Sequence, residues 1–169
     1  MSPRFRPAKA ALLLGSALLA LPAAAATYCF IDAIAAAGFG IYDGLQNDGA
    51  VTTIRGRCTN TPPPGTGPTI FPVISLSPGL AASYAPRQMT SGASRLNYNL
   101  FTTAARTVVW GDGSGSTATV PAYLAAFALN GNQTLAFNNP NLTIYGSIPA
   151  GQTVPTGLYA DTITVTLTF

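Results

Sequence analysis

The chain of 169 residues contains no histidine and no glutamate, and its only lysine is Lys9. Histidine bases, Schiff-base lysines, glutamate pairs and histidine-containing metal sites are therefore excluded. Catalysis would fall to scattered aspartates and hydroxyl groups. Asp112 lies among glycines, as turn residues do, and Asp161 enters a predicted strand, where we expect local hydrogen bonds. We predict that the protein is not an enzyme and uses no metal or other cofactor.

Charge of either sign is scarce, and the positive excess is confined to one end. Arg4, Arg6 and Lys9 lie within the first nine residues, whereas from residue 27 onward five arginines are balanced by five aspartates. That part of the chain has no electrostatic footprint for nucleic acid or an anionic membrane. We predict no nucleic-acid partner.

No apolar run is long enough for a comfortable membrane span. The longest run, Ala10–Leu21, follows the N-terminal cations and is succeeded by a proline and small residues at 22–26. This order is typical of a secretory signal, and the alternative is an uncleaved N-terminal anchor. We predict a signal peptide over residues 1–26 and a single exported domain over residues 27–169.

The chain has only two cysteines, Cys29 and Cys58, and both fall in the predicted domain. An even number of cysteines in an exported chain favours a disulfide. The pair lacks a C-x-x-C spacing, and no lysine or histidine lies near it to lower a thiol pKa, so a redox role is the weaker interpretation. We expect a structural disulfide that closes a loop of about 30 residues and contributes ~3–4 kcal/mol.

The composition disfavours helices, because 17 glycines and 14 prolines punctuate the chain and threonine is frequent. Two short stretches, 32–37 and 123–129, have some helical character. The first adjoins glycines, and the second fits a helical turn or a strand equally well. Short alternating runs separated by turn signals predict a single all-β sandwich. The predicted strands lie at 49–58, 72–77, 95–101, 106–110, 142–148 and 159–169.

The C-terminal strand lacks the features that normally protect the edge of a sheet. From residue 162 onward, threonines alternate with Ile163, Val165, Leu167 and Phe169, and no charge, proline or glycine interrupts the pattern. Natural edge strands carry such interruptions to prevent pairing with other chains. This strand is either central and paired on both sides, or an edge that accepts a strand from another chain. The pattern alone favours neither.

Eight short segments form an ordered set along nearly the whole predicted domain. They are Cys29, GFGIYD at 38–43, IRGRC at 54–58, RQM at 87–89, LNYNLF at 96–101, VWGDG at 109–113, IYGSIPAGQ at 144–152 and GLYADTITV at 157–165. Each is weak by itself, but the ordered set resembles the spore coat protein U domain family, the pilin domains of archaic (Csu-type) chaperone–usher pili.

The resemblance implies an incomplete immunoglobulin-like β-sandwich that is completed by a donor strand from another chain. In such pilins a periplasmic chaperone lends the strand first, and the next subunit replaces it at the outer-membrane usher. By this resemblance the groove for the donor strand and chaperone is lined by Ile163, Val165, Leu167 and Phe169. The cysteine pair corresponds to the family's disulfide. The expected partners are the chaperone, the usher and neighbouring pilins, and the expected location is the cell surface, reached through the periplasm.

The start of the predicted domain departs from the pattern of shaft subunits, which carry a long alternating apolar extension before the first cysteine. Here only Thr27 and Tyr28, or at most residues 25–28, lie between the predicted cleavage site and Cys29. At about 3.4 Å per residue they cannot span a groove of strand length. We expect a subunit that accepts a donor strand but gives none, which is the tip position. Because tip subunits of this family have two domains, a minor or stand-alone surface subunit is the alternative.

Apolar residues near predicted turns are candidates for an adhesive surface. They are Ile70 and Phe71 beside a proline-rich loop, and Tyr123, Leu124 and Phe127 farther along the chain. Exposed apolar patches often mark binding sites, although packing into the sandwich is the simpler interpretation for aromatic side chains. A structural or adhesive pilus subunit is the leading hypothesis. A secreted, self-contained, lectin-like binding module is the alternative.

Overall fold

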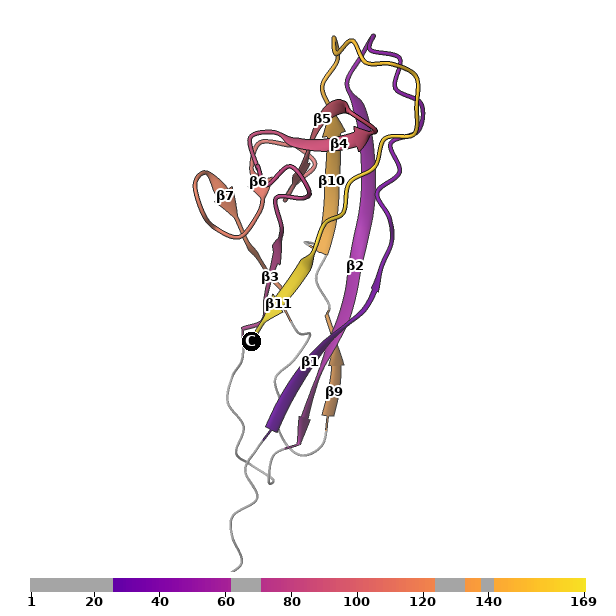
Figure 1. The fold of residues 1–169 in the computed structure, drawn as a ribbon. Helices are drawn as coiled ribbons and strands as arrows, with labels where there is room; N and C mark the ends of the chain where they lie inside the picture. Colours follow the sequence, from indigo (N-terminus) through magenta and orange to yellow (C-terminus); the bar gives the residue numbers. More distant parts are fainter. Residues whose placement is uncertain (1–25, 62–70, 124–132, 138–141) are drawn as a thin grey trace, which may run out of the picture.

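The structure is a computed structural model that describes residues 26–61, 71–123, 133–137 and 142–169. The first 25 residues, and with them nearly all of the predicted signal peptide, lie outside these ranges. In the described part the regular secondary structure is almost entirely strand (Figure 1), as the composition predicts. None of its helical segments has the length and apolarity needed to cross a bilayer.

The strands vary widely in length. They are β1 (Ala26–Ile34), β2 (Asp48–Thr61), β3 (Val73–Leu76), β4 (Arg87–Ser91), β5 (Ser94–Phe101), β6 (Val109–Trp110), β7 (Thr117–Ala118), β8 (Val120–Pro121), β9 (Gln133–Ala136), β10 (Thr143–Ile148) and β11 (Val165–Thr168).

Two sheets enclose one core. The larger sheet has eight strands, with the order β1-β2-β10-β5-β6-β7, and in addition β4 pairs with β5 and β9 with β2. The smaller sheet has the order β11-β3-β8. All of these pairs are antiparallel except β6 with β7. The predicted β-sandwich is confirmed.

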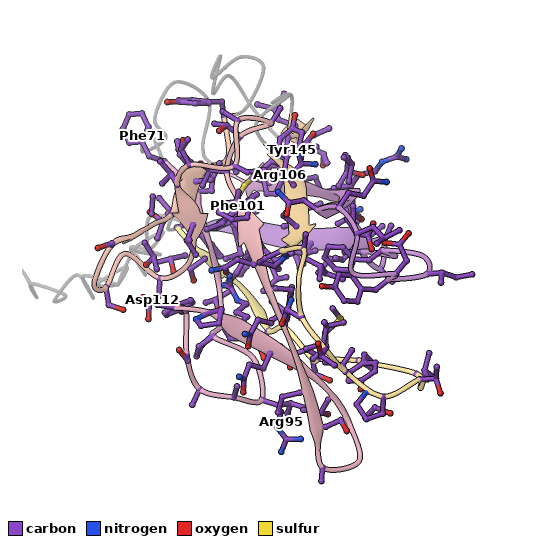
Figure 2. All side chains as sticks on the ribbon, turned by 90° about the horizontal axis from the view of Figure 1, so that it is seen from above. Phe71, Arg95, Phe101, Arg106, Asp112 and Tyr145 are labelled. Atoms are coloured by element: carbon purple, nitrogen blue, oxygen red, sulfur yellow. A yellow bond between two sulfur atoms is a disulfide. The ribbon has the colours of Figure 1, made fainter. Side chains whose placement is uncertain are left out.

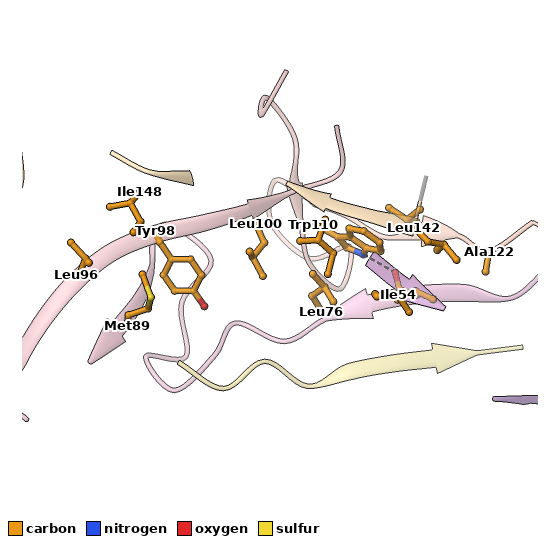
Figure 3. Close-up of a cluster of buried hydrophobic side chains, with 13 residues drawn as sticks. Ile54, Leu76, Met89, Leu96, Tyr98, Leu100, Trp110, Ala122, Leu142 and Ile148 are labelled. Carbon is orange, nitrogen blue, oxygen red and sulfur yellow. Dashed lines mark hydrogen bonds between the residues drawn. The ribbon is translucent and has the colours of Figure 1, made fainter. Parts of the chain in front are cut away.

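The core follows the two-residue period of the strands, because alternate side chains of a strand point to the same face. On β5 of the larger sheet, Leu96, Tyr98 and Leu100 are buried, and on β3 of the smaller sheet Ile74 and Leu76 meet the same cluster (Figure 3). Opposed inner faces of two sheets thus supply one hydrophobic core.

Trp110 and Arg87 tie the two sheets together from inside the core, and both are fully buried. The indole of Trp110 donates a hydrogen bond to the carbonyl of Ile74, at 3.0 Å. The guanidinium of Arg87 donates to the carbonyls of Ser77 and Trp110 and to the side-chain oxygen of Asn99, at 2.7 to 3.0 Å. Burial lowers the pKa of Arg87, and among the described residues no carboxylate forms an ion pair with it. Arg87 therefore acts as a multiple hydrogen-bond donor to carbonyls that the core would otherwise leave unpaired.

The structure contains four short strands that were not predicted, β4, β7, β8 and β9. Three further differences from the predictions have a physical reason. The helical character of residues 32–37 is not realised, because β1 extends to Ile34 in register with β2 and tertiary pairing overrides local propensity. The strand predicted at 106–110 begins only at Val109, since Arg106 has a positive φ of 51° in a turn. The hydrogen-bonded part of the last strand is shorter than the alternating pattern and covers Val165–Thr168.

The buried hydrogen bonds of Arg87 lead to a stability prediction. We expect Arg87→Leu to lower the free energy of unfolding by about 3 kcal/mol, because the substitution leaves buried carbonyls without donors. The matched control is Arg95→Leu, since Arg95 is exposed and bonds only nearby carbonyls, and it should cost less than ~0.5 kcal/mol. Urea denaturation followed by the fluorescence of Trp110, the sole tryptophan, measures both. Equal losses would contradict the role given to Arg87.

Candidate functional site

A groove lies between the segment that follows β1 and the segment that leads into β11. It consists of an inner hollow of about 340 Å³ and an outer hollow of about 800 Å³. The two hollows adjoin, because both are lined by Ala37, Phe39, Met89 and Tyr159. The buried residues Leu76 and Tyr98 and other core side chains form the floor of the inner hollow. The groove therefore opens directly onto the hydrophobic core.

The first bank of the groove comprises residues 34–42. Ile34 forms the last pair of β1 with β2, and within the described ranges residues 35–43 make no backbone-to-backbone hydrogen bond. Side chains hold this bank instead. The hydroxyl of Thr52 donates to the carbonyl of Ala35 at 2.6 Å, and the ring of Phe39 packs edge-on against Tyr98, with centroids 5.9 Å apart.

Phe39 can lie over β10 because a glycine faces it. A Cβ atom at Gly146 would lie 2.6 Å from the Phe39 ring, which is closer than Cβ atoms approach other carbons. The first bank is thus fixed in position by packing while its backbone edge stays open.

The second bank comprises residues 159–165 and continues into β11. Ile163, Val165 and Leu167 are half-buried and pack against the core, whereas the threonines between them are exposed. The predicted alternation is therefore present. Ile163 and Val165 line the inner hollow. Leu167 lies beyond its lining residues, and Phe169 is 54% exposed at the end of the chain.

β11 pairs with β3 and with no other strand in the described part of the chain. The amide of Ser77 donates to the carbonyl of Thr164 at 2.9 Å, so the backbone groups of Thr164 point toward β3. Because backbone groups alternate in direction along a strand, those of Ile163, Val165 and Leu167 point toward the groove. All three residues have unpaired backbone groups on this side, and Ile163 and Val165 also present their apolar side chains to the groove.

A polar contact reinforces the second bank. The carboxylate of Asp161 accepts hydrogen bonds from the phenol of Tyr98 at 2.7 Å, from the amide of Leu80 at 2.9 Å and from the amide of Thr162 at 2.7 Å. Two of these bonds are long-range, so the expectation of purely local bonding for Asp161 is wrong. A Cβ atom at Gly79 would lie 2.1 Å from the carboxylate, so a glycine is needed there. Asp161 fixes the entry to the last strand against β5.

Burial, and then the hydrogen bond to Asp161 and its negative charge, raise the pKa of Tyr98 well above the usual value for a phenol. Tyr98 thus stays protonated and donates to Asp161 throughout the physiological pH range.

Two of the predicted adhesive residues form an exposed aromatic pair. The antiparallel register of β3 and β8 pairs Val73 with Pro121, and the amide of Ala122 donates to the carbonyl of Pro72 at 2.7 Å. Phe71 directly precedes Pro72 and Tyr123 directly follows Ala122, so both lie at the same end of this strand pair. Their side chains are 71% and 55% exposed, and Figure 2 shows Phe71 pointing away from the body of the protein. Packing into the sandwich is therefore wrong for both.

The other three predicted adhesive residues, Ile70, Leu124 and Phe127, lie outside the described residues.

The remaining candidates have structural roles. Cys29 and Cys58 lie opposite each other on β1 and β2 and are joined by a disulfide. Asp112 accepts hydrogen bonds from the amide and hydroxyl of Ser114 in a turn, and these bonds lower the pKa of Asp112. Among the described residues, no group of three His, Cys, Asp or Glu side chains gathers to hold a metal ion.

Sequence reasoning missed the first bank and the polar contact. An aromatic residue between two glycines, Phe39, was the available signal for the bank, because such a residue in an irregular segment often anchors it. No sequence signal joined Asp161 to Tyr98, since 63 residues separate them.

Comparisons with known proteins agree with this geometry. The profile of the Spore Coat Protein U domain family matches residues 16–166. Protein U of Myxococcus xanthus is 33% identical over 106 residues, which cover 57% of this chain and 51% of that protein. The chain thus spans about half the length of this relative.

Among solved structures, the chain is similar to one in the crystal structure of the CsuC–CsuE chaperone–tip adhesion subunit pre-assembly complex from archaic chaperone–usher Csu pili of Acinetobacter baumannii. The TM-score is 0.52 at 20% identity, over 85% of this chain and 40% of that chain. The likeness concerns the fold.

The contact between Tyr98 and Asp161 predicts a loss of stability in alkaline solution. Above pH ~10 the unfolded chain releases the Tyr98 proton while the folded chain keeps it, so the free energy of unfolding falls with rising pH. This contribution should approach about 1.4 kcal/mol per pH unit. Urea denaturation between pH ~9 and ~11.5 measures the slope. Tyr98→Phe should make the slope shallower and cost about 1 kcal/mol near pH 7. Equal slopes for the two proteins would contradict the assignment.

Proposed function

Because the chain belongs to the Spore Coat Protein U domain family, we propose that it is a subunit of a chaperone–usher pilus whose groove receives a donor strand from another chain. The observation that carries the proposal is the groove itself. It exposes core side chains, and no backbone pairing crosses it among the described residues.

A donor strand supplies both the backbone hydrogen-bond partners and the apolar side chains that the groove lacks. Its amides and carbonyls pair with the unpaired backbone groups of Ile163, Val165 and Leu167, which is β-strand addition. Its alternate apolar side chains enter the inner hollow and cover the floor around Tyr98 and Leu100. Because buried backbone groups are costly when unpaired, the bound strand contributes hydrogen bonds and hydrophobic burial together.

The proposal also assigns the route of export. Residues 1–26 act as a secretory signal, and residues 27–169 form the pilin domain. A periplasmic chaperone supplies the first donor strand, and a neighbouring pilin replaces it at the outer-membrane usher. The mature subunit then lies in a fibre at the cell surface.

A tip position is supported by the pairing of β1. Ala26–Ile34 is paired with β2 in the chain's own sheet, and the disulfide from Cys29 to Cys58 fastens the two strands. Residues held in this way are not free to leave as a donor strand. A subunit that accepts a strand but gives none ends a polar fibre.

The exposed aromatic pair supports an adhesive role for this subunit. Phe71 lies just before β3 and Tyr123 lies just after β8, at one end of the smaller sheet, and both are exposed. Two exposed aromatic rings provide apolar contact area at low entropic cost. We assign the pair to contact with an external surface.

The groove is tested by a pair of neighbouring substitutions on one strand. Val165→Asp places a carboxylate in the inner hollow and should reduce copurification with a coexpressed periplasmic pilus chaperone by more than about tenfold. Thr166→Asp adds the same charge to the exposed face of the same strand and should leave capture unchanged.

Equal capture of both variants would contradict the groove. Melting of the wild-type domain at the same temperature with and without a saturating donor peptide would favour the self-contained binding module instead, because a strand that binds the groove stabilises the folded state.

The tip position and the adhesive role are tested together on purified pili. Gold-labelled antibody against this chain should decorate one end of each fibre, because a subunit without a donor strand has a neighbour on one side only. Phe71→Ser with Tyr123→Ser should keep this label and lower adhesion of the cells to an apolar surface by about tenfold. Label along the shaft would rule out the tip, and unchanged adhesion would rule out the aromatic pair.

A further inference from the structure

Three aliphatic side chains at one end of the molecule are almost fully exposed. They are Ile41, Leu45 and Leu158, with exposed fractions of 93%, 85% and 88%. They lie on residues 38–47 and 149–158, two loops that meet at the top of Figure 1. We call these two loops the apolar pole. Asp43 is the only charged residue in them.

The loops of the apolar pole are held firmly, so the exposure does not come from frayed chain. The phenol of Tyr42 donates to the carbonyl of Pro149 at 2.9 Å and accepts from the amide of Gln152 at 2.8 Å. The amide of Gly151 donates to the carbonyl of Gly44 at 2.9 Å. Ile41 and Leu45 each lie beside one of these anchored residues. Large apolar side chains that stay exposed on anchored loops have an unfavourable contact with water that no contact within the chain offsets. Such exposure is typical of an interaction surface.

The apolar pole is continuous with the groove. Ile41 and Leu158, one from each loop, both line the outer hollow, so a strand that extends along the groove passes between the two loops. The polypeptide that continues from the end of the strand between these loops therefore lies against the apolar pole.

The direction of β11 indicates which part of the donating subunit lies against the apolar pole. β11 runs away from the apolar pole, and the carboxyl terminus lies toward the other end of the molecule (Figure 1). Antiparallel pairing is the more stable arrangement per residue, and β11 already uses it with β3. A donor strand antiparallel to β11 runs toward the pole, and the chain that follows the donor strand leaves the groove there.

We propose that the apolar pole is the docking surface for the folded body of the subunit that donates the strand. The inference rests on the proposed function. The matching surface is an uncharged apolar patch on the residues that directly follow the donor strand. This second contact buries Ile41, Leu45 and Leu158 and fixes the angle between the two subunits, which a strand and a flexible connection alone do not fix.

Site-specific photo-crosslinking in assembled pili on the producing cell tests the docking surface. p-Benzoylphenylalanine replaces Leu45 or Leu158 at the pole, Ala36 in the inner hollow, or Ser116, an exposed residue in a different loop. We expect Ala36 to crosslink to the donor strand of a neighbouring pilin. Leu45 and Leu158 should crosslink to the same pilin at residues beyond that strand, and Ser116 should give background yield.

The outcomes separate the two proposals. A crosslink from Ala36 without any above background from Leu45 and Leu158 would overturn the docking surface and leave the donor strand in place. Crosslinks from the pole only to a chaperone or to a second copy of this chain would overturn it as well. Without a donor crosslink from Ala36, both proposals fall.

A matched set of substitutions measures the contribution of the pole. Leu45→Ser with Leu158→Ser should speed release of this subunit from purified pili in guanidinium by about tenfold or more, because two buried leucines are lost from the contact. Leu80→Ser removes another exposed leucine, 66% exposed, that lies outside the pole, and this variant should be released at the wild-type rate. Equal release rates for all three proteins would overturn the docking surface.

Discussion

The unpaired backbone edge of β11 is the constraint on which the rest of the structure depends. Ile163, Val165 and Leu167 turn their hydrogen-bonding groups away from β3, the side chains of Ile163 and Val165 line the groove, and β3 supports the strand from one side only. Natural sheets normally protect such an edge with charge, proline or a bulge. In this strand none of these features is present, although hydrogen bonds and packing fix the residues around the edge in position. That combination is what a surface for strand addition requires.

The buried polar groups explain how a strand with a single neighbour keeps its place. Asp161 ties the start of the last strand to Tyr98 on β5, and Arg87 ties the end of β3 to Asn99 and Trp110. These hydrogen bonds are directional, so they fix positions that hydrophobic packing alone leaves adjustable. The two sheets are therefore held at a fixed separation beside the groove, and the groove keeps its shape for the proposed donor strand.

The sequence predicts the features that depend on local pattern. Alternation indicates β2, β3, β5, β10 and the last strand, because each has one buried and one exposed face. Alternation does not predict β1, which includes residues with helical character. The residues of β2 that pair with β1 lie 20 or more positions away along the chain. The open edge was an undecided alternative for the same reason: whether β11 has one neighbour or two is a property of the topology. The bank at Phe39 and the contact between Asp161 and Tyr98 depend on side chains brought together from distant segments.

The two ends of the molecule differ in kind, and the groove between them has a direction. One end of the smaller sheet carries the aromatic pair of Phe71 and Tyr123, and the other end of the molecule carries the aliphatic loops of the apolar pole. In the proposed fibre, an antiparallel donor strand enters the groove from the first end and leaves at the second, so the body of the donating subunit lies on the side of the pole. The aromatic end then faces away from the fibre. A subunit with a neighbour on one side only has a free end, and an exposed aromatic surface is useful only where no other subunit covers it. In the proposed fibre, the unpaired edge of β11, the apolar pole and the aromatic pair all follow from one head-to-tail order of the subunits.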